Sequence, residues 1–561
     1  MVNWKSKKTG DMLLLATGIV ALLLMNILSS QFFFRLDLTE ERRYTIHNST
    51  RDMLENLDDE VYVEVFLEGE LNAGFRRFQK AIRETLETFR IYSGNSVQYS
   101  FTDPATALSQ KARSEFMADL ASKGIQPTNV IDTREGERVE KIIFPGVVIS
   151  YSGAEKGVML LKGNKAGTPE EEINQSIEGI EFEIANAIHK LAETDPKQIG
   201  MVSGHGELDG LSIASFDQAV SELYHTRRVN LGDRSLSDFE ALVIAKPTMP
   251  FSETDKYRLD QYIMQGGKVL FLLDRLDASM DSATQATHFA IPYETRLDDQ
   301  LFRYGTRINP DLLQDRYASR YPVITGQRPD GTAQIQLMDW PFFPLINRFP
   351  EHPITHNLDM VLTRFVSSID TVKAAGVTKT PLMLTSQYSR KLTAPVNVNI
   401  NELRDNLTAE QFTEKFIPVA WLLEGTFTSL FKNRFLPEGA EKGSFREESE
   451  ATSLIVVSDG DLARNEINRR TGLSLPLGFD PFTNYTFANQ DLLLNMISYL
   501  VDENGLIRAR NKEIRIRPLD RERIAAEKLK WQVTNLGLPL AILVVFGMVR
   551  SHWRKRKFAN F

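Results

Sequence analysis

The residues most suggestive of chemistry lie in a glycine-rich loop, Gly204-His-Gly-Glu-Leu-Asp-Gly210, directly after an apolar run that ends at Ser203. Between a strand and a helix, the backbone N–H groups of such a loop can hold an anion. The spacing is G-x-G-x-x-x-G, so Asp209 stands where the dinucleotide-binding pattern has its third glycine. Because Glu207 and Asp209 would also repel phosphate, the loop is not predicted to bind a nucleotide.

Metal binding or hydrolysis is the second possibility for this loop. The alternation of His205, Glu207 and Asp209 can place all three side chains on one side of an extended segment, as a metal site requires. The chain has eight His and no second ligand cluster in its sequence, so a tight turn permitted by the glycines is favoured. We assign no catalytic and no metal-binding residue, and we predict Ser203, His205, Glu207 and Asp209 as candidate ligand-binding residues.

A second acidic turn, Ser458-Asp-Gly-Asp461, also follows an apolar run. Two aspartates can bind a cation, but the full pattern of calcium ligands is missing. Asp-Gly is a common turn signal, so a turn is favoured here as well.

Several enzyme classes are excluded by residues that the sequence lacks. The chain has no cysteine, which excludes a thiolate nucleophile, a Cys-ligated zinc and the zinc deaminases, whose His-x-Glu motif needs a Pro-Cys-x-x-Cys partner. Neither the phosphate-binding motif G-x-x-x-x-G-K-[ST] nor the nucleophile motif G-x-S-x-G occurs. The chain is therefore not predicted to hydrolyse ATP by itself, and we predict no cofactor.

Alternating strands and helices must position these loops. In the first part of the chain, strands are predicted at 61–67, 97–102, 141–151 and 157–161, and helices at 75–92, 108–123 and 170–191. In the second part, strands are predicted at 198–203, 227–230, 241–245, 268–273, 416–424 and 452–458, and helices at 213–223, 253–265 and 489–500. The fold class is therefore α/β: the first unit is similar to the thioredoxin-like fold, and the second has the pattern of a doubly wound sheet.

Two charge-free stretches predict membrane-spanning helices that flank this body. Residues 12–34 and 531–549 are each long enough to cross a hydrocarbon core of about 30 Å. Lys5, Lys7 and Lys8 precede the first stretch, and five basic residues follow the second, so the positive-inside rule places both termini in the cytoplasm. A cleaved signal peptide is disfavoured, because the first stretch is too long and lacks a small-residue cleavage site. Gly18, Asn26, Gly537 and Pro539 are candidate contacts with membrane partners, since small and polar residues pair membrane helices.

The predicted organisation of the chain has seven consecutive parts. It consists of a cytoplasmic N-terminus at 1–11, a transmembrane helix at 12–34, a first periplasmic α/β domain at 35–195, a second periplasmic α/β domain at 196–500 with an insertion at about 275–350, a return segment at 501–530, a transmembrane helix at 531–549 and a basic cytoplasmic tail at 550–561.

Charge is distributed unevenly along the chain. The whole chain carries −8, whereas residues 1–34 carry +2 and residues 531–561 carry +5, so residues 35–530 carry −15. An acidic body disfavours nucleic acids and anionic membrane surfaces as partners.

Several short motifs, taken in order between the two apolar stretches, resemble one known family. They are Arg35-Leu-Asp-Leu-Thr-Glu40, Arg43-Tyr-Thr-Ile46, Val202-Ser-Gly-His-Gly-Glu207, Tyr262-Ile-Met-Gln-Gly-Gly-Lys268 and Ile516-Arg-Pro-Leu-Asp520. The chain resembles the GldG family, the gliding-motility-associated auxiliary subunits of ABC transporters. This resemblance implies a polytopic permease and a separate cytoplasmic ATPase as partners, a bacterial inner membrane location and a role in gliding or cell-surface export. It also suggests that the second unit is similar to glutamine-amidotransferase-like domains, whose cysteine nucleophile this chain cannot provide.

Two functions remain open. The first is a non-catalytic periplasmic subunit that couples the permease to a periplasmic or cell-envelope partner or ligand. The alternative is a membrane-tethered periplasmic hydrolase or carbohydrate-processing enzyme that uses His205, Glu207 and Asp209.

Overall fold

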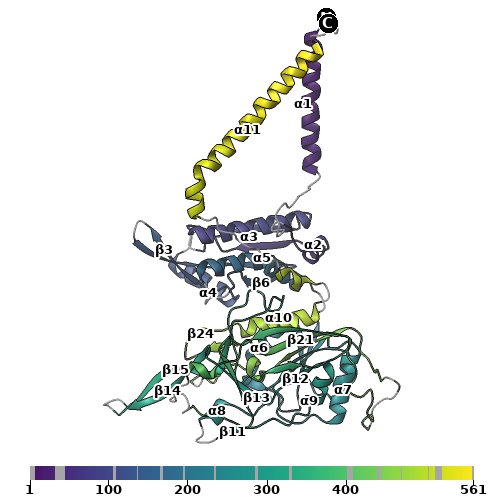
Figure 1. The fold of residues 1–561 in the computed structure, drawn as a ribbon, viewed down its shortest axis with the longest axis vertical. Helices are drawn as coiled ribbons and strands as arrows, with labels where there is room; N and C mark the ends of the chain where they lie inside the picture. Colours follow the sequence, from purple (N-terminus) through teal and green to yellow (C-terminus); the bar gives the residue numbers. More distant parts are fainter. Residues whose placement is uncertain are drawn as a thin grey trace. The chain divides into compact units, whose positions relative to one another are not determined.

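The two compact units of the chain are Met1–Glu513 and Ile514–Phe561, shown as a ribbon in Figure 1. The computed structural model describes residues 7–31, 45–104, 109–134, 137–163, 168–193, 196–232, 235–284, 288–327, 331–400, 408–438, 443, 445–468, 470–502, 505–511 and 521–558.

The first sheet is mixed and has four strands in the order β2-β1-β5-β6. Its strands are β1 (Val61–Val65), β2 (Val97–Phe101), β5 (Gly146–Tyr151) and β6 (Ala154–Met159). The strands β1 and β2 are parallel, with Val61 opposite Val97, whereas β5 runs antiparallel to both β1 and β6. The predicted strand at 141–151 is divided, because the hairpin of β3 (Thr128–Arg134) and β4 (Glu137–Ile143) ends before Pro145 and β5 begins after it.

Helices cover both faces of this first sheet. They are α2 (Asn48–Glu55), α3 (Ala73–Tyr92), α4 (Gln110–Ser122) and α5 (Pro169–Ala192). Phe75, Phe78, Ile82 and Leu86 lie on one side of α3 and are buried against the sheet together with α5, as an amphipathic spacing predicts. The opposite face of the sheet packs against Leu120 of α4. N-terminal capping residues define where α3 and α5 begin. At the start of α3, the Asn72 side chain accepts from the Phe75 N–H, and α5 begins with a capping box and a proline in its first turn.

The large sheet has seven strands in the order β18-β21-β22-β10-β9-β7-β8. Its strands are β7 (Gln198–Val202), β8 (His225–Val229), β9 (Ala241–Ala245), β10 (Lys268–Leu272), β18 (Val377–Leu384), β21 (Pro418–Gly425) and β22 (Thr452–Val457). The strands from β22 to β8 are parallel to one another, and β21 and β18 extend the sheet in antiparallel fashion. Six of these strands lie within a few residues of the predicted positions, whereas β18 was not predicted.

Helices pack on both faces of the large sheet. They are α6 (Ala214–Ser221), α7 (Glu253–Met264), α9 (Asp298–Tyr304) and α10 (Asn489–Val501). Alternate residues of β9 separate the two cores: Val243 packs with α6 and α10, whereas Leu242 and Ile244 pack with α7 and α9. This alternation buries both faces of the parallel strands and confirms the mixed α/β class.

The chain between β10 and β21 adds further short helical and strand elements. They are α8 (Met280–Ala283), β11 (Phe289–Ala290), β12 (Thr306–Ile308), β13 (Asp311–Asp315), β14 (Ala318–Gln327), β15 (Ala333–Ile346), β16 (Val361–Leu362), β17 (Ile369–Thr371), β19 (Ser389–Thr393), β20 (Val396–Asn397) and the 3₁₀ helix η3 (Ala409–Gln411). After β22 come η4 (Gly460–Ala463), β23 (Phe479–Asp480), β24 (Tyr485–Thr486) and η5 (Leu506–Asn511). This region has an apolar core of its own around Trp340, Phe342 and Phe365.

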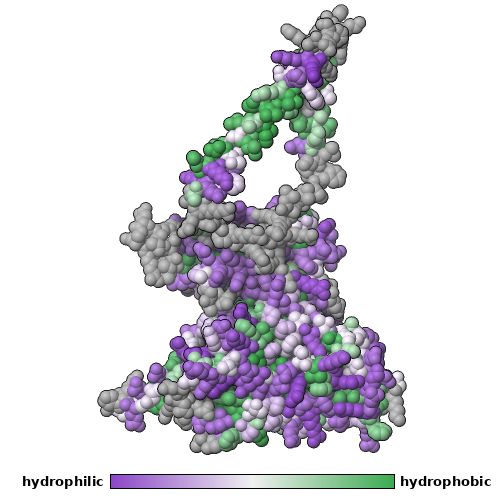
Figure 2. Space-filling view, viewed as in Figure 1, coloured by the Kyte–Doolittle hydropathy of each residue, from purple (hydrophilic) through white to green (hydrophobic). Residues whose placement is uncertain are grey.

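Apolar helices lie near both ends of the chain. The helix α11 (Arg521–Phe558) contains a segment, Ala526–Arg556, that is long and apolar enough to cross a membrane, and its side chains are exposed. Figure 2 shows apolar residues gathered along this helix. The helix α1 (Lys7–Gln31) has a shorter apolar segment, Met12–Asn26, and the last three residues of the predicted span at 12–34 lie outside the described residues.

Candidate functional site

The Gly204–Gly210 loop lies at the point of the large sheet where the strand order reverses. The chain passes from β7 outward to β8 and then returns to β9 on the other side of β7. Ligands of open α/β sheets bind at such a switch point, outside the carboxyl ends of the strands. The loop after β7 is fastened to the loop after β9, because the His205 carbonyl accepts from the backbone N–H groups of Thr248 (2.9 Å) and Met249 (2.8 Å).

Gly206 makes this close approach possible. Its φ is +75°, and a Cβ there would lie 2.2 Å from the Thr248 hydroxyl oxygen. A larger residue would therefore push the two loops apart.

The His205 side chain is almost fully enclosed. Its ring stacks on Phe251 with the ring centres 3.7 Å apart, and the side chain is 7% exposed. Nδ1 lies 3.2 Å from a Glu207 carboxylate oxygen, and Nε2 lies 3.3 Å from an Asp255 carboxylate oxygen. Both ring nitrogens are thus engaged, and the imidazole joins the loop after β7 to the first turn of α7, where Asp255 lies.

Two opposing effects act on the protonation of this group. Burial lowers the pKa of His205, but the hydrogen bonds with Glu207 and Asp255 outweigh it, so the pKa lies above its ordinary value. Burial raises the pKa of Glu207, but the bonds from the ring and the backbone N–H of His205 bring it below its ordinary value. The arrangement therefore favours an imidazolium held between two carboxylates.

The four candidate residues of the loop do not share one surface. His205 and Glu207 are in contact, whereas Asp209 is exposed and precedes the short 3₁₀ helix η1 (Gly210–Ser212). The Ser203 hydroxyl donates to the Val229 carbonyl at 3.4 Å. Within the part of the chain that the structure describes, no group of three or more His, Asp and Glu residues is arranged to hold a metal ion.

Asp255 is the partner that sequence reasoning missed. Ser252-x-x-Asp255 is a helix-start pattern, and the Ser252 hydroxyl indeed accepts from the Asp255 N–H at 3.1 Å. That pattern identifies the start of α7. It does not indicate the contact with His205, which depends on how β7 and β9 pair.

A second cluster of charges joins the ends of three adjacent parallel strands. Lys246 follows β9, Asp274 lies just beyond β10, and Asp461 lies in η4 after β22. The Lys246 ammonium lies 2.6 Å from a carboxylate oxygen of Asp274 and 2.6 Å from one of Asp461. All three side chains are no more than 7% exposed, and Lys246 has a left-handed backbone (φ +53°), which is unusual outside glycine.

Asp459 is the least compensated acid of this cluster. One of its carboxylate oxygens accepts from the Arg364 N–H at 2.8 Å, and the other has no hydrogen-bonding partner among the described residues. Burial, and then the neighbouring Asp274 and Asp461, raise the pKa of Asp459 well above its ordinary value. Burial also raises the pKa of Asp461, but Lys246 and Arg464 reverse this effect and bring it below the ordinary value.

Of the two aspartates in the Ser458–Asp461 turn, Asp461 is paired with the Lys246 ammonium, whereas Asp459 accepts from the Arg364 N–H. Gly460 begins the 3₁₀ helix η4, as a turn predicts, and its N–H donates to Asp274. Because Lys246, Asp274 and Asp461 are buried and form ion pairs with one another, these three residues can hold the strand ends together.

The α/β body, with sheet-end loops joined by buried charge pairs, shares one chain with a helix that is long and apolar enough to cross a membrane, which suggests an association with a membrane. Residues 196–496 match the family model described as an ABC-type uncharacterized transport system, and the chain belongs to this family. A second model, for a domain of unknown function, matches residues 40–150. Membership of the first family gives the protein a role associated with ABC transport.

Two individual proteins are also similar to the chain. An uncharacterized protein of Borreliella burgdorferi is 21% identical over 551 residues, which cover 96% of each chain. The solved N-terminal domain of mmIFT52 is 12% identical, with a TM-score of 0.32 over 54% of this chain and 97% of that one, which is too low to define a shared fold.

Proposed function

We propose that the chain is a non-catalytic, membrane-anchored auxiliary subunit of an ABC transporter, with its α/β body in the periplasm and both termini in the cytoplasm. The family match over residues 196–496 carries this proposal. In this role the body couples a polytopic permease, driven by a separate cytoplasmic ATPase, to a periplasmic or cell-envelope partner. The resemblance to the GldG family adds gliding motility or cell-surface export as the process served.

The membrane anchor of this proposal rests on α11. Residues 531–549 carry no formal charge and reach about 28 Å at 1.5 Å per residue, which matches a hydrocarbon core of about 30 Å. Five basic residues follow at 550–557 and place that end in the cytoplasm. The stretch at 12–34 would supply the second span, and Gly18, Asn26, Gly537 and Pro539 would face the permease.

The arrangement of the sheet edge favours a binding role over hydrolysis. His205 has both ring nitrogens committed to Glu207 and Asp255, so it has no lone pair with which to activate water. Asp209, the third residue of the hydrolase alternative, is exposed and lies apart from this pair.

The proposed domain limits follow the two sheets. The first domain, 35–195, contains the sheet β2-β1-β5-β6, an order that is similar to the thioredoxin-like fold. The second domain, 196–500, contains the seven-stranded sheet with the insertion at about 275–350.

Topology can be tested directly because the natural chain has no cysteine. Single cysteines are introduced as Ser6→Cys, Tyr388→Cys and Ser551→Cys and treated in spheroplasts with a membrane-impermeant maleimide. We expect labelling of the Tyr388→Cys variant in intact spheroplasts, and labelling of the two terminal variants only after permeabilisation. Labelling of either terminus in intact spheroplasts would disprove the two-span topology.

Association is tested by purifying the chain from its native membrane in mild detergent, identifying co-purifying proteins by mass spectrometry and assaying ATPase activity. A permease and an ATPase in near-stoichiometric yield, unchanged by His205→Ala, are expected. A chain that purifies alone, with bound metal or with a hydrolase activity that His205→Ala abolishes, would instead establish the enzyme alternative.

A further inference from the structure

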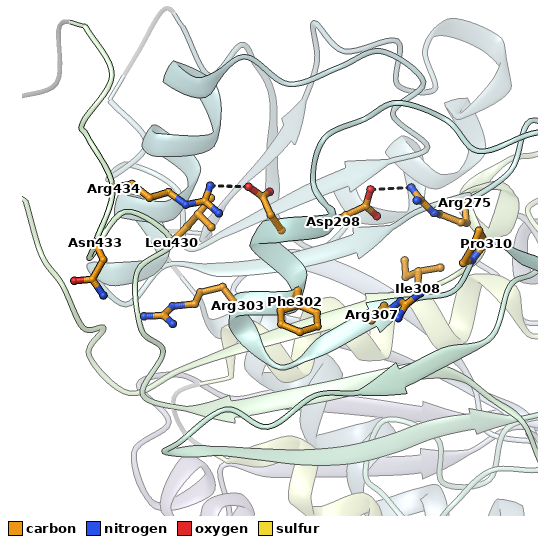
Figure 3. A pocket seen from close by; sticks show the side chains of 11 residues that line it. Arg275, Asp298, Phe302, Arg303, Arg307, Ile308, Pro310, Leu430, Asn433 and Arg434 are labelled. Carbon is orange, nitrogen blue, oxygen red and sulfur yellow. Dashed lines mark hydrogen bonds and ion pairs between the residues drawn. The ribbon is translucent and has the colours of Figure 1, made fainter.

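A cavity of about 600 Å³ lies beside α9 and β12 and is closed on another side by the segment after Leu430 (Figure 3). Four arginines line it: Arg275, Arg303, Arg307 and Arg434. Arg275 directly follows Asp274, so the cavity begins near the carboxyl end of β10, on the side of the sheet where α/β folds bind ligands. Its volume is within the usual range for small-molecule sites, about 300–1,000 Å³.

The two acids of the cavity are already neutralised. Asp298 pairs with Arg275 at 2.9 Å, and Asp299 pairs with Arg434 at 2.7 Å. Asp299 also holds the buried ammonium of Lys256 at 2.8 Å. Burial raises the pKa of Asp299, but Lys256 and Arg434 bring it below its ordinary value, so this acid stays ionised and committed to its partners.

Arg303 and Arg307 provide the uncompensated charge. Arg303 donates only through Nε, to the Ser429 carbonyl at 3.3 Å, and within the described residues neither guanidinium has a carboxylate partner. Among the described residues, four arginines and two aspartates give the lining a net charge of +2. Since residues 35–530 together carry −15, this is a local positive site in a strongly acidic body.

Two elements that line the cavity, α9 and the segment after Leu430, are joined by hydrogen bonds to one buried carboxylate. The fully buried Asp260 on α7 accepts from the Tyr304 hydroxyl on α9 (2.9 Å), the Ser429 hydroxyl (2.6 Å) and the Leu430 N–H (2.8 Å). One carboxylate thereby fastens α9 to the segment that carries Asn433 and Arg434. A site built on supported elements loses less entropy when it binds a ligand.

An exposed phenylalanine ring lies beside Arg303 and Arg307 in the cavity lining. Phe302 is 52% exposed, a high value for a phenylalanine, and in the view of Figure 3 its ring lies between the Arg303 and Arg307 side chains. Arginine forks match the oxygen pairs of carboxylate and phosphate groups. The exposed ring offers an apolar face beside them.

We propose that this cavity binds a small organic oxyanion, with its carboxylate or phosphate held by Arg303 and Arg307 and its apolar part packed on Phe302. This site goes beyond the auxiliary-subunit function and does not depend on it, because a permease need not be present for the cavity to bind its ligand.

Calorimetric titration of the full chain in mild detergent tests the site with three probes: phenyl phosphate, phenylacetate and inorganic phosphate. We expect phenyl phosphate to bind at least about 10-fold more tightly than inorganic phosphate, because only the former can contact Phe302. Phe302→Ala should remove most of that difference. Tighter binding of phenyl phosphate or of phenylacetate then decides between a phosphate and a carboxylate ligand.

The arginines are tested by substitution, with a matched control. Arg303→Ala and Arg307→Ala should each weaken binding by about 10- to 100-fold, the effect of losing a charged hydrogen-bonding group. Arg320→Ala removes an arginine that is 62% exposed and outside the cavity, and it should leave binding unchanged. Far-UV circular dichroism is used to check that each variant is folded. The proposal is overturned if no probe binds at about 10 mM, a concentration that reveals even millimolar affinity, or if the Arg303→Ala/Arg307→Ala double variant binds as the natural chain does.

Discussion

Replacing Lys246 with methionine tests whether the buried ion pairs of Lys246 with Asp274 and Asp461 stabilise the fold. Methionine keeps the length of the side chain and removes its charge. Asp274 then has no cation within ion-pair distance among the described residues, whereas Asp461 keeps Arg464 at 2.5 Å. Because Asp274 is 5% exposed, its carboxylate would be left buried and uncompensated.

Breaking one partner out of a buried ion pair costs about 3–5 kcal/mol. We therefore expect Lys246→Met to lower the free energy of unfolding by about 4 kcal/mol. In a urea titration the unfolding midpoint should fall by this loss divided by the m-value, which for a chain of 561 residues is larger than the value of about 1–3 kcal/mol/M for small proteins. Tryptophan fluorescence reports the transition, since Trp421 on β21 pairs with Val456 of β22. Hydrogen exchange of the peptide over 452–461 should rise at the same time.

A matched control separates burial from charge. Lys432 also contacts two carboxylates, at 2.8 and 3.5 Å, but at the surface. Lys432→Met should leave the free energy of unfolding almost unchanged, because solvent-exposed ion pairs contribute little to stability. Adding Asp274→Asn to Lys246→Met should restore part of the lost stability, because it removes the stranded charge. A buried, uncompensated charge is not the cause if Lys246→Met lowers the free energy of unfolding no more than Lys432→Met does. The same conclusion follows if the Lys246→Met/Asp274→Asn variant loses as much stability as Lys246→Met and Asp274→Asn lose together when made singly.

Three further predictions concern protonation and the membrane. The pKa of His205 is raised in the folded state, so its contribution to stability is full below about pH 6.5 and is lost as the pH rises through the folded pKa. His205→Gln should therefore flatten the fall in unfolding free energy between pH 6 and pH 8, as measured in denaturant titrations, by less than about 2 kcal/mol, the most that one proton contributes over that range. The raised pKa of Asp459 acts in the same direction, with its stabilisation lost above the folded pKa. Asp459→Asn, which mimics the protonated acid, should stabilise the protein more at pH 8 than at pH 4, close to the unfolded pKa of an aspartate, about 3.9; equal effects at both pH values would contradict the assignment. Leu543→Arg at the centre of the α11 span should cost about 2.5–3.5 kcal/mol of insertion and let an impermeant maleimide reach a Ser551→Cys site in intact spheroplasts, whereas Ala526→Arg, before the span, should leave that site protected.

Much of the local structure follows from short-range pattern. The amphipathic spacing of α3 and the unbroken apolar run of β9 predict both elements, because burial on one face or on both faces determines which residues are apolar. The long, charge-free stretch of α11 predicts its own helix for a similar reason. The hairpin of β14 and β15 escaped prediction because most of its side chains from 324 to 337 are exposed, so no hydrophobic period marks it.

The sequence by itself determined the residue types available for chemistry, the absence of cysteine, the order of strands and helices and the apolar helix near the C-terminus. Only the tertiary structure decided which charges meet. Lys246 and Asp461 are 215 residues apart in the chain, and His205 and Asp255 are 50 apart. Both contacts depend on the order in which the parallel strands pair. Strand order is set by packing over the whole sheet, so no local pattern encodes these contacts.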